Sequence, residues 1–160
     1  MTIKVGDKIP SFTLLKATAE GPQPVDTDSY FAGRRVALFS VPGAFTPTCS
    51  ARHLPGYVEK AGELKAKGVD EIACVAVNDA FVLQAWAQQA GADGKVTMLA
   101  DGNGDFAKAL DLVMDASKFG MGTRGQRWSA IVEDGVVKEL NVEEPGAFSV
   151  SSADFMIGRL

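Results

Sequence analysis

The sequence predicts an α/β fold in which helices flank a mixed central β-sheet. Over most of the chain, apolar strand-like runs alternate with segments whose apolar residues recur at helical spacing, as in strand–helix–strand units. The last third instead carries a strong two-residue hairpin signal, Asp134-Gly135, followed by one more helical segment. Parallel crossovers combined with a hairpin make the sheet mixed. With 160 residues, 46% of them hydrophobic, the chain is expected to form one domain, residues 1–160, with a full core.

The first forty residues are expected to form an extended region and then the first central strand. Residues 11–15 have weak strand character, and residues 20–24 form a turn that contains two prolines. Residues 25–31 suit a short strand and a helical turn. Residues 35–40 form an apolar run, which indicates a short buried strand.

The segment after this strand is expected to be helical as far as Gly68. Residues 57–67 place apolar side chains on one helical face, and Gly68 ends the helix. Pro55 either kinks one helix that begins before it or separates two helices. Residues 72–77 are almost wholly apolar, which suits a strand in the middle of a sheet.

A further helix follows this strand. Asn78 or Asp79 supplies its N-cap, and Trp86 is expected in the core rather than in contact with a cofactor. The positions that share one face at helical spacing are Phe81 or Val82, Ala85, Trp86 and Gln89.

The remainder of the chain is expected to complete the sheet. After a strand at residues 96–100, the turn at residues 101–104 contains two glycines, but their spacing fails the dinucleotide-binding pattern and no P-loop lysine is present. A plain turn therefore fits better than a phosphate site. The later elements are a short helix at 105–110, a loop containing Gly and Met up to Arg127, strands at 128–133 and 136–141, and a closing helix at 153–160.

The stretch from Val41 to Cys49 places a thiol at the start of a helix. Thr46 suits the N-cap and Pro47 suits the first helical position. Cys49 then falls in the first turn, where free backbone N–H groups and the helix dipole favour an anion. A thiol at such a place ionises more easily than a free one. Cys49 is therefore a candidate nucleophile.

Composition and charge argue against several classes of partner. The net charge of −4 and the scattered lysines and arginines disfavour nucleic acid and anionic membranes. No apolar run approaches the roughly 20 residues of a membrane span. Two cysteines are too few for a secreted disulfide scaffold, and residues 1–7 lack the basic start and apolar core of a secretory signal. A cytoplasmic location is expected.

The motif Pro42-x-x-x-Thr46-x-x-Cys49 resembles the active-site signature of the peroxiredoxins, a family of thiol peroxidases. The fuller sequence is similar to the type II (peroxiredoxin V-like) branch. The resemblance covers nearly the whole chain, through residues 41–56, 72–79, 99–101 and 122–128. It implies a thioredoxin-like fold with N-terminal additions. It also implies reduction of hydrogen peroxide and small alkyl hydroperoxides, in antioxidant defence and cell redox homeostasis.

A geometric argument supports this fold. Cys49 lies beyond the C-terminal end of its strand, whereas Arg127 lies just before the N-terminal end of its own. The two residues reach the same edge of the sheet only if these strands are antiparallel. The thioredoxin-like sheet provides such a pair.

The resemblance also implies roles for the site residues. Cys49 is the peroxidatic nucleophile, which attacks a peroxide oxygen, becomes a sulfenic acid and releases water or an alcohol. Thr46 and Arg127 are expected to hydrogen-bond the peroxide oxygens, and Pro42 to shape the pocket and shield the thiolate. From spacing alone Arg124 is a rival of Arg127. The resemblance selects Arg127, because it directly precedes a strand in the order Arg-aromatic-Ser.

Three further residues are secondary candidates. Met121, in the loop before Arg127, is expected to line an apolar peroxide pocket. His53 is the only histidine, and it either acts as a base at the site or packs and hydrogen-bonds beside the Cys49 helix. Cys74 is either a buried structural cysteine or the residue that resolves the sulfenic acid.

The sulfenic acid is expected to be recycled by outside thiols, in a 1-Cys-like mechanism. Branch members that resolve internally carry a cysteine near the C-terminus, and residues 148–152 contain none. Type II members with cysteines at the positions of Cys49 and Cys74 are generally reduced by outside thiols. The resemblance thus implies glutathione with glutaredoxin, or thioredoxin, as the reductant. It also suggests a homodimer packed near the active-site end, with which the apolar loop residues Phe45, Phe119 and Met121 are compatible.

Two other functions would use the same cysteine differently. A redox-sensing or chaperone-like protein would be oxidised without turnover and would hold a stable partner. A dithiol–disulfide oxidoreductase needs a Cys-x-x-Cys pair, and position 46 is Thr. One histidine gives no metal cluster, so neither a metal nor another cofactor is expected.

Overall fold

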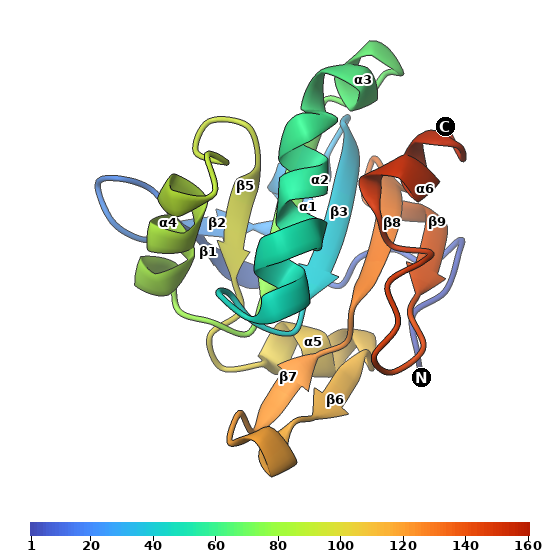
Figure 1. Cartoon of the computed structure of the whole chain (residues 1–160). Helices are drawn as coiled ribbons and strands as arrows, with labels where there is room; N and C mark the ends of the chain where they lie inside the picture. The colour runs from blue at the N-terminus through green and yellow to red at the C-terminus, as the bar shows by residue number, and fades with distance from the viewer.

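The computed structural model describes the whole chain, Met1–Leu160, and contains one large and one small sheet (Figure 1). The large sheet comprises β1 (Thr13–Lys16), β2 (Gln23–Asp26), β3 (Arg35–Val41), β4 (Glu71–Ala76), β5 (Thr97–Ala100), β8 (Trp128–Glu133) and β9 (Val136–Val142). The small sheet comprises β6 (Val113–Asp115) and β7 (Thr123–Gly125). The large sheet has the order β2-β1-β5-β4-β3-β8-β9.

The large sheet is mixed, as predicted. β3 is parallel to β4, and β4 is parallel to β5. β8 is antiparallel to β3, with Trp128 opposite Ser40, and the Asp134-Gly135 turn joins β8 to β9. Because β8 starts where β3 is about to end, the residue before β8 lies beside the loop that leaves β3. The antiparallel relation predicted for the strands next to Cys49 and Arg127 is confirmed.

Helices cover both faces of the large sheet, so the fold has three layers (Figure 1). The helices are α1 (Thr27–Phe31), α2 (Leu54–Glu59), α3 (Ala61–Ala66), α4 (Ala80–Gln89), α5 (Asp105–Leu110) and α6 (Ala153–Ile157), with a π-helical turn at Cys49–His53 and a 3₁₀ turn at Ser117–Phe119. The helices α2, α3, α4 and α6 cover one face, and α1 and α5 cover the other. None of the helices has the length and apolar character that crossing a membrane requires.

Side chains of β3 alternate between the two cores, as a strand requires. Phe39 belongs to the core under α2 and α4, where its ring stacks on Tyr57 with centroids 4.0 Å apart. Leu38 belongs to the opposite core, with α1 and α5. The strand is therefore buried on both faces, which explains why its sequence is apolar apart from Arg35 and Ser40.

The sequence predicted the N-terminal strands of the large sheet but not the small sheet. β1 pairs antiparallel with β2 and β5, which confirms the N-terminal additions. The loop between residues 111 and 127 was expected to be irregular but contains the small β6–β7 sheet. Each of its strands has only three residues, too few for an alternating pattern to appear in the sequence.

Trp86 is buried as predicted, but the predicted face of α4 is wrong. The buried side chains are Ala80, Leu83, Trp86 and Ala87, whereas Phe81 is 71% exposed. The helix α4 carries apolar side chains of its own on nearly all sides, so the spacing of apolar residues is compatible with two different buried faces. Alanines at positions 80 and 87 allow close packing on the sheet, and this tertiary fit selects the face.

Pro55 does not separate two helices. Helical structure runs from the π-helical turn into α2 and through Pro55, and the break between α2 and α3 falls at Lys60. Proline lacks the N–H that would continue the hydrogen-bond ladder. It is tolerated here at the second position of α2, directly after the widened turn.

Asp101 links β5 to α5 through its carboxylate. Its Oδ1 accepts a hydrogen bond from the Phe106 amide (3.0 Å), and its Oδ2 accepts one from the Ala107 amide (2.9 Å). Burial raises the pKa of Asp101, and these two amides partly offset that effect. The carboxylate thus serves amides of the first turn of α5 that have no partner within the helix.

Replacing Asp101 by Ala should therefore lower the free energy of unfolding by about 2 kcal/mol, because two buried amides lose their acceptor. Urea unfolding followed by circular dichroism measures this change. The matched control is Asp105→Ala, which removes an exposed carboxylate from the first turn of the same helix. A loss at Asp101 no larger than that at Asp105 would contradict the linking role.

Candidate active site

Cys49 lies in a widened helical turn that follows the β3 loop. Cys49–His53 form a π-helix, in which the Leu54 amide donates to the Cys49 carbonyl five residues earlier. Such wide turns are frequent at functional sites. Cys49 and His53 are both fully buried, whereas Arg52 between them is exposed. The turn therefore directs two side chains, four residues apart, into the interior.

Arg127 bridges these two buried side chains. Its Nη2 donates to the Sγ of Cys49 at 3.1 Å, and its Nη1 lies 2.7 Å from the Nδ1 of His53. This contact places a positive charge directly beside the sulfur. Two of the predicted site residues, Cys49 and Arg127, are thus in direct contact.

His53 is held in one tautomer by its two neighbours. Arg127 can only donate, so the Nδ1 of His53 accepts. The Ser151 carbonyl, 3.0 Å from Nε2, can only accept, so Nε2 carries the proton. Burial, followed by the positive charge of Arg127, lowers the pKa of His53 to about 3. The imidazole is therefore neutral near pH 7, and it has no free nitrogen with which to take a proton from a substrate.

Thr46 lies where the helix begins, but its hydroxyl does not cap the helix as expected. Its Oγ1 donates to the Gly43 carbonyl (2.7 Å), because the intervening loop turns tightly and places Phe45 at φ 65°. The helical ladder starts with the Ser50 amide, which donates to the Thr46 carbonyl (2.9 Å). The Cys49 amide precedes that ladder and is free to donate.

Gly43, the residue after Pro42, lies close to the side chains of Thr46 and Met121. A Cβ built on Gly43 would lie 3.3 Å from the Cγ2 of Thr46 and 3.4 Å from the Cε of Met121. The Nη1 of Arg124 would lie closer still, at 2.9 Å, so any side chain at position 43 would have to displace that guanidinium. The structure therefore brings Met121 next to Pro42 and Thr46, although the three residues come from two distant parts of the chain.

Arg124, the rival of Arg127, has a different place. Its Nε donates to the Met121 carbonyl (3.0 Å), and its Nη1 donates to the Pro42 carbonyl (3.2 Å). Arg124 thus ties the β7 segment to the loop after β3 and makes no hydrogen bond to Cys49. Of the two arginines, only Arg127 reaches the sulfur.

Cys74 lies in β4 and belongs to the same core as Cys49. Both thiols are free and fully buried. Burial, and after it the neighbouring Cys49, raises the pKa of the Cys74 thiol well above its usual value. A neutral thiol without exposure is a poor nucleophile.

A segment near the C-terminus, residues 143–152, packs over His53; we name it the C-terminal strap. Its conformation is fixed by the carboxylate of Glu143, which accepts hydrogen bonds from three consecutive backbone amides at 2.8 Å each, those of Ser149, Val150 and Ser151. Sequence reasoning missed Glu143. A single Glu after a strand carries no motif, and its partners are backbone groups that no sequence pattern identifies.

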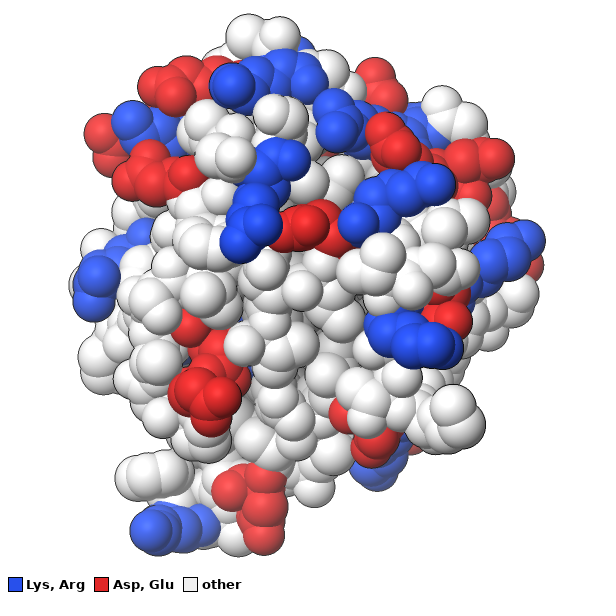
Figure 2. Space-filling view, turned by 90° about the vertical axis from the view of Figure 1, so that its right-hand side faces the viewer, with Lys and Arg blue, Asp and Glu red and all other residues white.

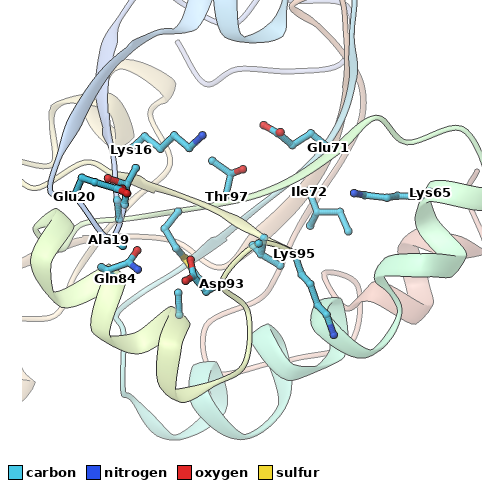
Figure 3. A pocket seen from close by; sticks show the side chains of 16 residues that line it. Lys16, Ala19, Glu20, Lys65, Glu71, Ile72, Gln84, Asp93, Lys95 and Thr97 are labelled. Carbon is cyan, nitrogen blue, oxygen red and sulfur yellow. The ribbon is translucent and has the colours of Figure 1, made fainter.

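The cavity shown in Figure 3 lies away from these residues. It has a volume of about 400 Å³, and none of the predicted site residues lines it. Lys16 and Glu71 point toward one another across it, with Thr97 between them (Figure 3). Glu71 and Thr97 begin β4 and β5, which run parallel to each other and to β3. The cavity is therefore at the end of the sheet opposite to Cys49.

Charges of both signs are mixed over the face seen in Figure 2. Lysines and arginines alternate with acidic residues there, around a broad uncharged area, and form no continuous basic stripe. This face therefore has no continuous basic surface along which a nucleic acid could bind.

The chain matches a family model described as Redoxin over residues 4–157. Peroxiredoxin-2E-2, chloroplastic, from Oryza sativa subsp. japonica is 53% identical over 99% of this chain and 73% of the relative. Reduced Prx3 from Vibrio vulnificus, solved in complex with H2O2, is 50% identical, covers 99% of both chains and has a TM-score of 0.95. Peroxiredoxin 5 from Alvinella pompejana is 33% identical over 99% of both chains, with a TM-score of 0.85.

The cytoplasmic location expected from the sequence is wrong. Peroxiredoxin-2E-2 is named chloroplastic, and so is Peroxiredoxin-2E from Arabidopsis thaliana, which is 48% identical over 99% of this chain and 70% of the relative. The expectation rested on two cysteines and on the composition of residues 1–7. Neither feature separates the cytosol from other reducing compartments.

The similarity to solved peroxiredoxins extends over nearly the whole chain and includes the sheet order that sets Arg127 beside Cys49. It confirms the thioredoxin-like fold and the family that the Pro42-x-x-x-Thr46-x-x-Cys49 motif indicated. The chain therefore belongs to the peroxiredoxin family, in its type II (peroxiredoxin V-like) branch, and is a thiol peroxidase.

Proposed function

We propose that Cys49 is the peroxidatic nucleophile and that Arg127 and Thr46 hold the peroxide against it. The observation that carries this proposal is the 3.1 Å hydrogen bond from the Nη2 of Arg127 to the Sγ of Cys49. A guanidinium has five N–H donors, of which contacts with the sulfur and with His53 use two. The others remain for the peroxide oxygens, which gain charge as their bond breaks.

The reaction forms an S–O bond while the O–O bond breaks. The thiolate of Cys49 attacks one peroxide oxygen and is oxidised to a sulfenic acid. The electron pair of the O–O bond leaves with the second oxygen, which takes up from solvent the equivalent of the proton that the thiol lost on ionising and departs as water or an alcohol. The proton of Thr46 is committed to Gly43, so its oxygen can accept from the peroxide O–H, while the Cys49 amide donates to an oxygen.

Hydrogen peroxide and small alkyl hydroperoxides are the substrates that we propose. The Met121 methyl group and the Thr46 methyl group both lie close to Gly43, and such an apolar contact suits a short alkyl group. The Prx3 relative from Vibrio vulnificus was solved with H2O2, which supports the same small substrate for this chain.

Outside thiols are proposed as the reductant, either glutathione with glutaredoxin or thioredoxin. Residues 148–152 contain no cysteine, and Cys74 is buried as a neutral thiol. The sulfenic acid then condenses with an incoming thiol, which releases water and leaves a mixed disulfide for a second thiol to reduce. In this cycle the chain uses one cysteine, and residues 1–160 act as one domain.

A homodimer that packs near the active-site end is proposed as the assembled form. Phe45, in the loop after β3, is 48% exposed. Phe119, in the 3₁₀ turn just before Met121, is 72% exposed. Exposed aromatic side chains of this kind are typical of protein interfaces.

Cys49→Ser should reduce peroxide consumption to the uncatalysed background with either reductant, whereas Cys74→Ser should retain turnover. The assay follows peroxide loss with glutathione plus glutaredoxin and, separately, with thioredoxin. If Cys74 resolves the sulfenic acid, Cys74→Ser will show one round of oxidation without turnover, which would contradict the 1-Cys cycle.

Arg127→Gln should lower the second-order rate constant for oxidation of Cys49 by about 10²–10³-fold, because a donor to the developing charge is lost. Stopped-flow mixing of reduced protein with peroxide measures this step alone. Arg159→Gln, which removes an exposed arginine in the C-terminal region, is the matched control and should leave the rate constant unchanged. A similar loss in both variants would contradict the proposed role of Arg127.

His53 should destabilise the fold as the pH falls, because it is neutral when folded and titrates near pH 6.5 when unfolded. Below pH 6.5 the unfolded chain binds a proton that the folded chain does not. From pH 7 to pH 5 the wild type should lose about 2 kcal/mol of unfolding free energy relative to His53→Asn. Urea unfolding at both pH values measures this difference, and a pH-independent difference would contradict the buried neutral ring.

A further inference from the structure

We propose that Glu143 is a positioning residue for Arg127, acting through the Ser151 carbonyl and His53. The inference deepens the proposed function, since it rests on the role given there to Arg127. It concerns groups that do not touch Cys49. Its basis is a continuous chain of hydrogen bonds from the C-terminal strap to the sulfur.

The first step is the carboxylate of Glu143, which fixes the conformation of the C-terminal strap through hydrogen bonds. Besides the three backbone amides of the strap, the Ser151 hydroxyl donates to its Oε2 at 2.7 Å, and the Ser149 hydroxyl lies 3.4 Å from its Oε1. All these partners are donors, and an ionised carboxylate is an acceptor only. Burial opposes its ionisation, but the hydrogen bonds together hold the pKa of Glu143 below its usual value. A glutamine would direct an NH2 group at some of these donors.

The second step is the Ser151 carbonyl, which the folded strap aims at α2 and the turn before it. The carbonyl accepts two hydrogen bonds, one from the Nε2 of His53 (3.0 Å) and one from the hydroxyl of Tyr57 (2.9 Å). It therefore fixes the proton on Nε2. Without this carbonyl in place, either ring nitrogen could carry the proton.

The third step is the contact between the Nδ1 of His53 and Arg127, at 2.7 Å. With the proton on Nε2, Nδ1 presents a lone pair to the guanidinium. With the proton on Nδ1, two donors would face each other, and the guanidinium would be pushed away from its place beside Cys49. The strap thus selects the tautomer that holds Arg127.

A neutral acceptor also preserves the charge of the guanidinium. A carboxylate in place of His53 would hold Arg127 as firmly but would cancel its charge beside the sulfur. The imidazole instead lies among the rings of Phe39, Tyr57 and Phe148, with centroids 4.8, 5.7 and 5.0 Å away. These rings bury the imidazole completely, whereas the guanidinium of Arg127 is only half-buried.

The test uses Glu143→Gln, with Glu144→Gln as the matched control because Glu144 is an exposed neighbouring carboxylate. His53 is the only histidine, so ¹⁵N NMR of its ring at pH 7 gives one unambiguous pair of signals. We expect one protonated and one unprotonated nitrogen in the wild type and in Glu144→Gln. In Glu143→Gln we expect exchange between the two tautomers. A spectrum of Glu143→Gln identical to that of the wild type would overturn the proposal.

Stopped-flow oxidation of Cys49 provides the second readout. Glu143→Gln should lower the rate constant by about 10–100-fold, the loss expected when a catalytic group is misplaced by a fraction of an ångström to an ångström. In His53→Asn the rate constant should no longer depend on Glu143, because the Asn oxygen can accept from Arg127 in place of Nδ1 and has no alternative tautomer. Adding Glu143→Gln to His53→Asn should therefore lower the rate constant for Cys49 oxidation little further. Fully additive losses in the two variants would overturn the relay.

Two outcomes separate this inference from the proposed function. If the wild type consumes no peroxide, or if Cys49→Ser does, the proposed function fails, while the NMR spectra still test the relay. If Glu143→Gln does not fold, Glu143→Asp keeps the negative charge but shortens the side chain by one methylene group, so the carboxylate no longer reaches all three amides of the strap. This variant should show a tautomer mixture and a several-fold slower oxidation, and an unchanged spectrum would overturn the proposal.

Discussion

The proposed active site depends on one guanidinium held between a sulfur and an imidazole. Arg127 reaches Cys49 because β8 runs antiparallel to β3 and begins beside the point where β3 ends. If β8 were parallel to β3, Arg127 would emerge at the other edge of the sheet, roughly 20 Å away at about 3.3 Å per residue. The widened turn at Cys49–His53 then directs the sulfur and the imidazole toward the same cation. The antiparallel strand order brings the Arg127 guanidinium to the site, and the π-helical turn places Cys49 and His53 against it.

This arrangement matters because ionisation alone contributes little to the rate. The intrinsic nucleophilicity of a thiolate falls as the pKa of its thiol falls, and this loss offsets much of what greater ionisation gains. The larger contribution must come from donors that meet charge as it moves onto oxygen. A neutral imidazole beside Arg127 leaves the charge of that donor undiminished, and the aromatic rings around the imidazole bury it completely.

The sequence predicted the elements that local patterns specify. The Asp134-Gly135 hairpin, the buried β3 and β4 strands and the thiol at a helix start all follow from periodicity, turn chemistry and capping preferences. The choice of Arg127 over Arg124 needed the family resemblance, because both precede β8 at plausible spacing. Glu143 could not be found, since its partners are backbone amides brought together only by the folded strap. The face of α4 was also missed, because packing against the sheet decided between two apolar stripes.

For Cys49 as the proposed peroxidatic cysteine, complete burial limits how fast the proposed cycle with outside thiols can run. A peroxide molecule is small enough to enter through brief fluctuations, but a tripeptide or a second protein must wait until the segment around the oxidised cysteine opens. Raising the reductant concentration then speeds turnover only up to a ceiling set by how often the polypeptide opens. That ceiling is a property of this chain, and it is the same for every reductant.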